Sequence, residues 1–173
     1  EIPEINLEHI KKMTTDFGII QFSIINSPDI HSGYTLDDNA RALIAFCQHY
    51  MVTGDHNDLL YIKIYYDFIK FCFQSNGAFL NYVNEAKEFT AQNELENLED
   101  SNGRALWALG FMISHKAILP TSLINDATNF IQLVVHNIHI IHSTRAMAFS
   151  IKGLYYLNSV MPSENNIELI RLL

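Results

Sequence analysis

The stretch of sequence that decides the fold is Asp37-Asp38-Asn39-Ala40-Arg41-Ala42-Leu43, which recurs as Asp100-Ser101-Asn102-Gly103-Arg104-Ala105-Leu106. Five of the seven positions are identical, and the exchange of Ala40 for Gly103 keeps a small residue. A weaker copy, Ile141-His142-Ser143-Thr144-Arg145-Ala146-Met147, keeps the Arg-Ala pair and loses the acid. Such internal repetition indicates that one supersecondary unit is used several times, so we expect the acids, amides and arginines of the copies to gather at the same end of the stack.

Each copy begins a segment that is apolar nearly all round: 38–52, 102–114 and 145–157. A helix without a polar face is expected to be surrounded by protein. The segments 4–14, 57–74 and 120–136 instead carry a polar stripe at helical spacing, and a last short helix follows from Ser163. Alternation of inner and outer helices is typical of stacked αα-hairpins. The sequence therefore predicts an all-α fold, a single helical domain over 1–173 that forms an (α/α) toroid or about half of one.

The sequence also predicts a long loop, a short ribbon and the location of the two cysteines. Residues 75–99 are polar and rich in Asn and Glu, so we expect a long loop near the functional site. Only Ala78–Val83 has the period of a strand over a useful length, and it predicts at most a short ribbon. Cys47 and Cys72 lie in apolar runs and are expected to be small core residues.

The composition of the chain excludes several classes of protein. The 173 residues are 49% hydrophobic and only 17% charged, which excludes a disordered chain. A net charge of −8 lacks the basic footprint of a nucleic-acid binder. The longest uncharged stretch, 127–144, contains Asn, Gln and His, so we expect no membrane span. We expect a cytoplasmic protein, although a chain that begins with Glu1 leaves export open.

The repeated motif has a structural interpretation, because acids at a helix start cap free N–H groups and pair with Arg four residues on. Two features favour a functional interpretation. Arg recurs near the start of all three helices, where the helix dipole disfavours a cation. His31, Gly33 and Tyr34 before the first copy, and Glu99 before the second, are not needed for capping.

The segment His31-Ser32-Gly33-Tyr34-Thr35-Leu36 followed by Asp37-Asp38-Asn39-Ala40-Arg41-Ala42-Leu43 resembles a motif of the six-hairpin glycosidase-like proteins. In particular, it resembles the helical domain found fused to bacterial and archaeal glycosyltransferases. Asn81-Tyr82 and the run from Glu99 to Gly110 resemble the second motif of that domain. The resemblance covers residues 31–110, and it implies an (α/α) toroid and carbohydrate-linked chemistry without designating the acting carboxylates.

Glycoside hydrolysis needs two carboxyl groups that flank the scissile bond. We expect Asp38 to act as one of them, with Glu99 or Asp100 opposite as the other. The candidate substrate-binding residues are His31, Tyr34, Asp37, Asn39, Arg41, Asn81, Tyr82, Ser101, Asn102, Arg104 and Arg145. Trp107 could stack on a sugar, although its place inside an apolar helix favours a core position. We expect no cofactor and no metal, and the spacing of His136, His139 and His142 does not alter this because no Cys or acid stands beside them.

Three functional hypotheses remain at this point. The first is a glycoside hydrolase-like enzyme that acts on oligosaccharide. The second is a non-catalytic helical module that binds glycan or docks a glycosyltransferase, and the third is a purely structural repeat. Because the chain holds only about three hairpins and ends in the apolar Leu169-Ile170-Arg171-Leu172-Leu173, we also expect a homodimer or a missing second half of the toroid.

Overall fold

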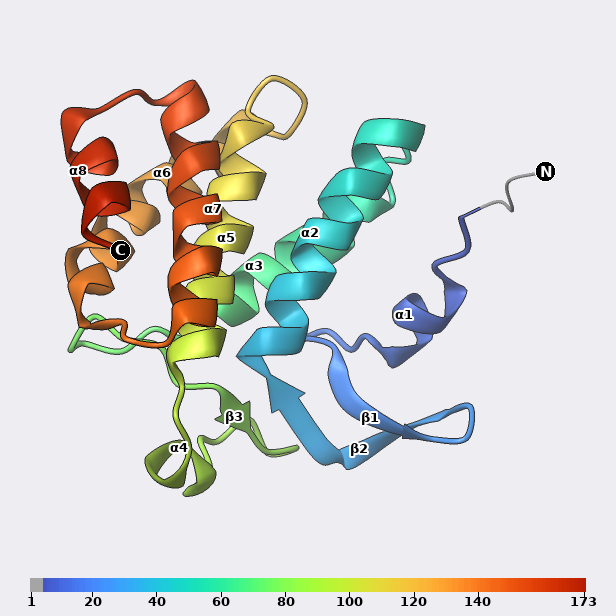
Figure 1. The fold of residues 1–173 in the computed structure, drawn as a ribbon. Helices are drawn as coiled ribbons and strands as arrows, with labels where there is room; N and C mark the ends of the chain where they lie inside the picture. The colour runs from blue at the N-terminus through green and yellow to red at the C-terminus, as the bar shows by residue number, and fades with distance from the viewer. Residues whose placement is uncertain (1–4) are drawn as a thin grey trace.

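A computed structural model describes residues 5–173, except for the side chains of residues 137, 139 and 140. Its centre is a row of three helices, α2 (Leu36–Thr53), α5 (Glu99–Ser114) and α7 (Thr144–Val160), with α5 packed between the other two. All three helices start at the same end of the molecule (Figure 1). The shared sequence motif therefore places its residues along one edge of the row, as the repeat predicts.

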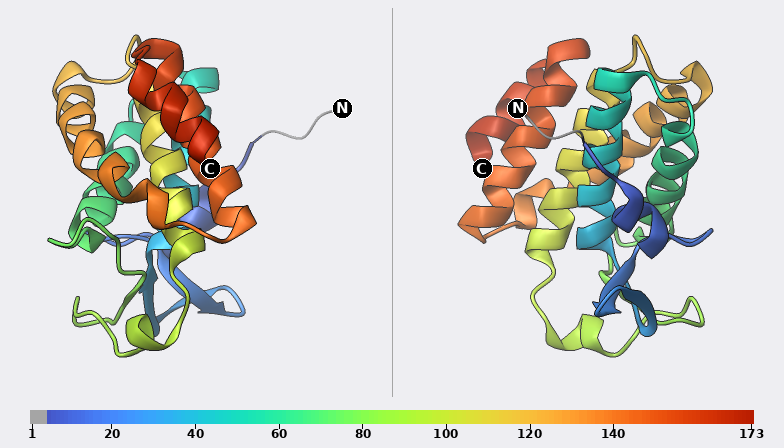
Figure 2. Two further views of the ribbon diagram at one scale, coloured as in Figure 1. Left: turned by 60° about the vertical axis from the view of Figure 1, so that its left-hand side comes forward. Right: turned by 90° about the vertical axis from the view of Figure 1, so that its right-hand side faces the viewer.

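A second layer of helices covers one side of this row (Figure 2). It contains α3 (Asp58–Cys72), which packs on α2, and α6 (Thr121–Val134), which packs on α5. A 3₁₀ helix, η1 (Val135–Ile140), continues from α6, and α8 (Glu164–Leu172) packs on α7. The core between the layers is aromatic and aliphatic, with Tyr65, Tyr66, Phe46 and Phe68 among its largest fully buried side chains. Within residues 5–173, no helix combines the length and hydropathy that crossing a bilayer requires.

Glycines allow α5 and α7 to approach each other closely. A Cβ on Gly103 would lie 2.6 Å from the carbonyl oxygen of Ala146, and one on Gly153 would lie 2.5 Å from that of Leu106. A Cβ on Gly110 would overlap the carbonyl oxygen of Gly153. The backbones of the two helices are thus in direct contact along this seam, which is possible only because these residues have no side chain.

The expected all-α fold is wrong. Strands β1 (Ile20–Ile24), β2 (Ser27–Thr35) and β3 (Tyr82–Val83) form an antiparallel sheet in the order β1-β2-β3. The sheet lies at the end where α2 and α5 start (Figure 1). The hairpin was missed because its two-residue turn contains Ile25 at a φ of 58°, a conformation that β-branched residues rarely adopt. The alternation from Ile20 to Ile24 was nevertheless a usable strand signal.

The structure does not show the expected (α/α) toroid either. The helices α2, α5 and α7 form a row in which α5 has two neighbours and the outer two have one each, and the described chain does not close a toroid (Figure 1). The expectation that protein surrounds all three helices therefore holds only for α5. In α7, Arg145, Ala148, Lys152 and Tyr155 are exposed, because no helix covers that side.

The other predicted segments differ from the structure mainly in the residues at which they begin and end. The first helix is shorter than the predicted 4–14 and spans Glu8–Met13 in α1, while residue 4 lies outside the described residues. The predicted loop 75–99 contains β3 and a short helix, α4 (Gln92–Leu95). Cys47 and Cys72 are free thiols in the core, as predicted, and burial raises the pKa of both.

Candidate functional site

The repeated motif forms a ladder of ion pairs across the helix starts. Asp37 of α2 pairs with Arg41 one turn later and with Arg104 of α5, and Asp100 of α5 pairs with Arg145 of α7. Each Asp therefore reaches an Arg on the next helix of the row. These pairs explain why Arg occurs at three helix starts, since each guanidinium faces a carboxylate that offsets the unfavourable helix dipole.

Asp37 is a partly buried acid of this ladder. Burial raises the pKa of its carboxyl above the usual range, and the guanidinium groups of Arg104 and Arg41 act in the opposite direction. Burial also lowers the pKa of Arg104, whose guanidinium lies 4.2 Å from the ring centre of Phe149. Asp37 and Arg104 thus form a partly desolvated contact that holds α2 against α5.

Glu99 connects the start of α5 to the start of α7. One carboxylate oxygen accepts the backbone N–H groups of His142 and Ser143, directly before α7 begins. These bonds, with the N–H of Ser143 having the larger effect, lower the pKa of Glu99 below its usual 4.5. Glu99 therefore serves as a cap supplied by a neighbouring helix, a role that its sequence position did not reveal.

We expect the Glu99→Gln variant to lose about 1 kcal/mol of unfolding free energy at pH 7, the usual value of a helix cap. Because the pKa of Glu99 is lower in the folded state, its stabilisation is complete above the unfolded pKa and disappears as the pH falls through the folded value. Urea unfolding of both proteins between neutral and acidic pH tests this. The difference between them should shrink below about pH 4, and a difference that stays constant would contradict the cap.

Asn39 and Asn102, the amides of the two motif copies, perform the same structural task. Asn39 is fully buried, accepts the N–H of Ile19 and donates to the carbonyl oxygen of Thr35. Asn102 accepts the N–H of Phe79 and donates to the carbonyl oxygens of Phe79 and Leu98. Each amide ties its helix to an extended segment beside it, so neither is available to a substrate.

Several other predicted substrate-binding residues are also structural. Asn81 is buried and caps the N–H of Asp37, and Ser101 donates to the carbonyl oxygen of Leu98. Tyr34 is 3% exposed and packs edge-on against Phe17. Tyr82 lies half-buried on β3, and His31 is exposed on β2, where it pairs with Glu85. The structure does not bring His31, Tyr34 and Tyr82 into one site.

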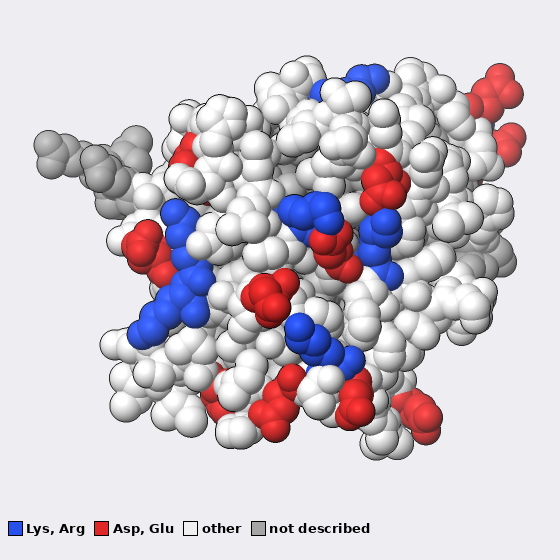
Figure 3. Space-filling view, turned by 180° about the vertical axis from the view of Figure 1, so that it is seen from behind, with Lys and Arg blue, Asp and Glu red and all other residues white. Residues whose placement is uncertain are grey.

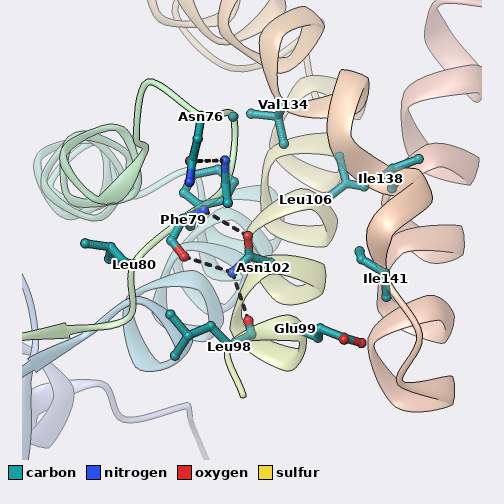
Figure 4. Close-up of a pocket in the computed structure, with 12 residues that line it drawn as sticks. Asn76, Phe79, Leu80, Leu98, Glu99, Asn102, Leu106, Val134, Ile138 and Ile141 are labelled. Carbon is teal, nitrogen blue, oxygen red and sulfur yellow. Dashed lines mark hydrogen bonds between the residues drawn. The ribbon is translucent and has the colours of Figure 1, made fainter. Parts of the chain in front are cut away.

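Two of the three predicted carboxylates line different cavities, and Asp100 is not among the residues that line either one. Glu99 and Asn102 lie at a cavity of about 310 Å³ between α5, the loop at 76–80 and η1. Its lining is mostly apolar, and the Asn102 amide is occupied by hydrogen bonds to the backbone (Figure 4). Asp38 and Arg41 line a second cavity of about 490 Å³ between α1, β1 and α2. The expected pair of Asp38 with Glu99 or Asp100 is therefore not assembled around either cavity.

The larger cavity contains polar residues that the sequence did not single out. Besides Asp38 and Arg41, its lining includes His9 of α1 and Gln21, Phe22 and Ser23 of β1. Asp38 accepts a hydrogen bond from the hydroxyl of Thr35 at 2.7 Å, and its other oxygen lies 3.6 Å from Arg41. Because β1 was not predicted, its residues could not be placed beside α2. The alternation of Gln21 and Ser23 with apolar residues was the only available signal.

Trp107 is half-buried between α5 and α7, which favours the structural alternative. Its ring is nearly parallel to that of Phe149, with ring centres 5.7 Å apart. The Nζ of Lys152 lies 3.4 Å from the centre of the indole ring. Phe149 and Lys152 thus occupy the ring surface that a sugar would need.

Charged side chains of both signs are mixed on one face of the molecule (Figure 3). On the face opposite that of Figure 1, acidic and basic side chains alternate and form no patch of one sign (Figure 3). Among the described side chains, no three His, Cys, Asp or Glu are grouped so that they could hold a metal ion. The side chain of His139, one of the three evenly spaced histidines, lies outside the described residues.

Comparisons with known proteins add no assignment. No protein-family model matches the chain, and no curated protein matches it. Its function is therefore inferred from the residues and their geometry.

Proposed function

We propose that the chain binds a neutral glycan in the cavity between α1, β1 and α2, without cleaving it. The observation that carries this proposal is the position of Asp38 and Arg41, which line a cavity of about 490 Å³ beside the amide of Gln21. Its size falls within the usual range for small-molecule sites. A carboxylate, a guanidinium and an amide together supply the acceptors and donors that neighbouring sugar hydroxyls require.

An aromatic ring adds the apolar part of such a site. Phe22 lines the same cavity and is 59% exposed, so its ring is open to the apolar face of a sugar. The motif resemblance of residues 31–43 and 99–110 to carbohydrate-linked helical domains supports the same ligand class. We propose on this basis that the chain is related to the six-hairpin glycosidase-like proteins.

The charge balance favours a neutral ligand over an acidic one. Three aspartates at the helix starts, Asp37, Asp38 and Asp100, are matched by three arginines, Arg41, Arg104 and Arg145. The ladder therefore contributes no net charge to the site, and the whole chain carries −8. A polar, uncharged ligand avoids the repulsion that an anionic glycan would experience from this acidic protein.

Binding is favoured over hydrolysis because a second available carboxylate is missing beside Asp38 in the described structure. Asp37 pairs with two arginines, Asp100 pairs with Arg145, and Glu99 binds the backbone before α7. Both glycosidase mechanisms require two carboxyl groups that flank the same bond. Docking of a glycosyltransferase partner and a cytoplasmic location belong to the same proposal, the latter because Cys47 and Cys72 are free thiols.

The Asp38→Asn variant tests this proposal. Isothermal titration calorimetry with a panel of neutral hexose di- and trisaccharides should identify a ligand of the unchanged protein. We expect affinity for that ligand to fall about tenfold to a hundredfold in the variant, the value of a hydrogen bond to a charged group.

Glu99→Gln serves as the matched control, because it also replaces a carboxylate by an amide but lies at the other cavity. It should leave the affinity unchanged. Equal losses in both variants, or no binding of any saccharide by the unchanged protein, would contradict the proposal. Cleavage of an oligosaccharide that both variants abolish would establish the hydrolase instead.

A further inference from the structure

The apolar cavity, which lies between α5, the loop at 76–80 and η1, has walls that hydrogen bonds hold in place. Asn102 of α5 accepts the N–H of Phe79 and donates to its carbonyl oxygen, which fixes the loop beside the helix (Figure 4). Within the loop, Asn76 accepts the N–H of Ala78. The cavity is therefore preformed by the fold, as small-molecule sites usually are.

Buried hydrocarbon side chains form most of this lining. Four of them are at most 7% exposed: Phe79, Leu106, Val134 and Ile138. Side chains around an unfilled cavity lack contacts that a packed core provides, and this loss lowers stability. The cavity measures about 310 Å³. At roughly 30 Å³ for each non-hydrogen atom, the volume that one water molecule occupies in the liquid, it suits an apolar molecule of about ten such atoms.

Glu99 supplies a negative charge to the same cavity. Figure 4 shows its side chain pointing from the start of α5 toward the segment that contains Ile141. One carboxylate oxygen accepts the backbone N–H groups of His142 and Ser143, and these donors carry no charge. Every Lys or Arg ion pair among the described side chains involves an acid other than Glu99. The carboxylate is thus hydrogen-bonded without being paired to a Lys or Arg.

Charge determines which apolar molecules suit the cavity. The hydrogen bonds that Glu99 accepts lower its pKa, so the carboxylate is ionised at neutral pH. An apolar anion would be repelled by Glu99 and by a chain with a net charge of −8. A neutral molecule would gain only the apolar contacts. An ammonium group would in addition form a charge-assisted hydrogen bond with the carboxylate.

We propose that the apolar cavity binds a small apolar amine, with its hydrocarbon body beside Leu106 and Val134 and its ammonium group at Glu99. The cavity that contains Asp38 shares no lining residue with this one. Binding of an amine therefore does not require binding of a glycan, and the two sites are tested separately.

Three ligands that share a phenyl group test the site: phenethylamine, phenethyl alcohol and phenylacetate. Titrations followed by the amide chemical shifts of the isotope-labelled protein measure their affinities and locate them. We expect phenethylamine to bind about tenfold more tightly than the alcohol, because only the amine carries a charge opposite to that of Glu99. Phenylacetate should bind most weakly. The shifts should concentrate at residues 76–80 and 134–141, which line the cavity, and not in α1 or β1.

Two variants separate the effect of charge from that of space. Glu99→Gln keeps an oxygen that can accept the two backbone N–H groups but has no charge. It should abolish the preference for the amine and leave the affinity for the alcohol unchanged. Val134→Phe fills part of the cavity, and it should weaken binding of all three ligands at least about tenfold. Val52→Phe is its matched control, because Val52 is 75% exposed near the end of α2, and it should change no affinity.

Four outcomes would overturn the proposal. They are no binding of the amine at millimolar concentration, an amine that binds no more tightly than the alcohol, a preference for the amine that persists in Glu99→Gln, and shifts confined to residues outside the cavity. Thermal unfolding shows whether Val134→Phe is folded. If it is not, the comparison of Glu99→Gln with the unchanged protein still decides between these outcomes and the proposed site.

Discussion

The Gly110→Ala variant is expected to lose about 3 kcal/mol of unfolding free energy, the upper part of the range for an overpacked core. A single methyl group has this effect because it would overlap the carbonyl oxygen of Gly153 on α7, which is backbone and cannot rotate away. Relief requires α5 and α7 to separate. These two helices form the most extensive helix–helix contact of the described chain, so their separation weakens the whole row.

Thermal and urea unfolding measure this loss, and for a chain of this length the melting temperature should fall by about 6–12 °C. Gly54→Ala provides the matched control. Gly54 ends α2 at a φ of 69°, and a Cβ there meets nothing within 4 Å. Its cost is conformational only, about 1 kcal/mol. Equal losses in the two variants would contradict the close approach of α5 to α7.

The Asp58→Ala variant is expected to lose about 1.5–3 kcal/mol of unfolding free energy, as when the charged acceptor of a buried hydrogen bond is removed. The Asp58 side chain is completely buried at the first residue of α3, and its carboxylate lies 2.6 Å from Nδ1 of His49 on α2. The carboxylate also faces the positive end of the α3 dipole. Its removal leaves the mostly buried imidazole without its acceptor and weakens the junction of α2 with α3.

Asp67→Ala is the control for this second prediction. Asp67 pairs with Lys63 on the exposed side of the same helix, and its loss should cost at most about 0.5 kcal/mol. In the double variant His49→Ala and Asp58→Ala, the loss should be smaller than the sum of the two single losses, because the pair acts as a unit. Additive losses in urea unfolding would show that the two side chains do not interact.

The candidate site could be predicted from the sequence only in part. The repeat predicted correctly that Asp37, Arg104 and Arg145 gather at one end of the row, and the ion pairs confirm this. It could not predict what each group binds. The repeated Asn39 and Asn102 looked like ligand contacts, but both satisfy backbone groups of neighbouring segments, and those segments are distant from them in sequence.

Nor could the sequence show that Asp38 and Glu99 lie at different cavities. Both acids lie in the first turn of an inner helix, and this shared location suggested that they would face the same site. The structure gives them different neighbours, because α2 borders α1 and β1 whereas α5 borders the loop at 76–80 and η1. Two similar helix starts therefore face two different cavities.

The sequence by itself determined the helices and their common direction, since apolar periodicity, capping residues and the repeated motif act over a few residues along the chain. Only the tertiary structure decided the rest. It placed β1 and α2 around one cavity, buried α5 on both sides while leaving one side of α7 open, and paired His49 with Asp58. These features depend on which surfaces meet in space, and packing between distant segments sets this rather than any local pattern.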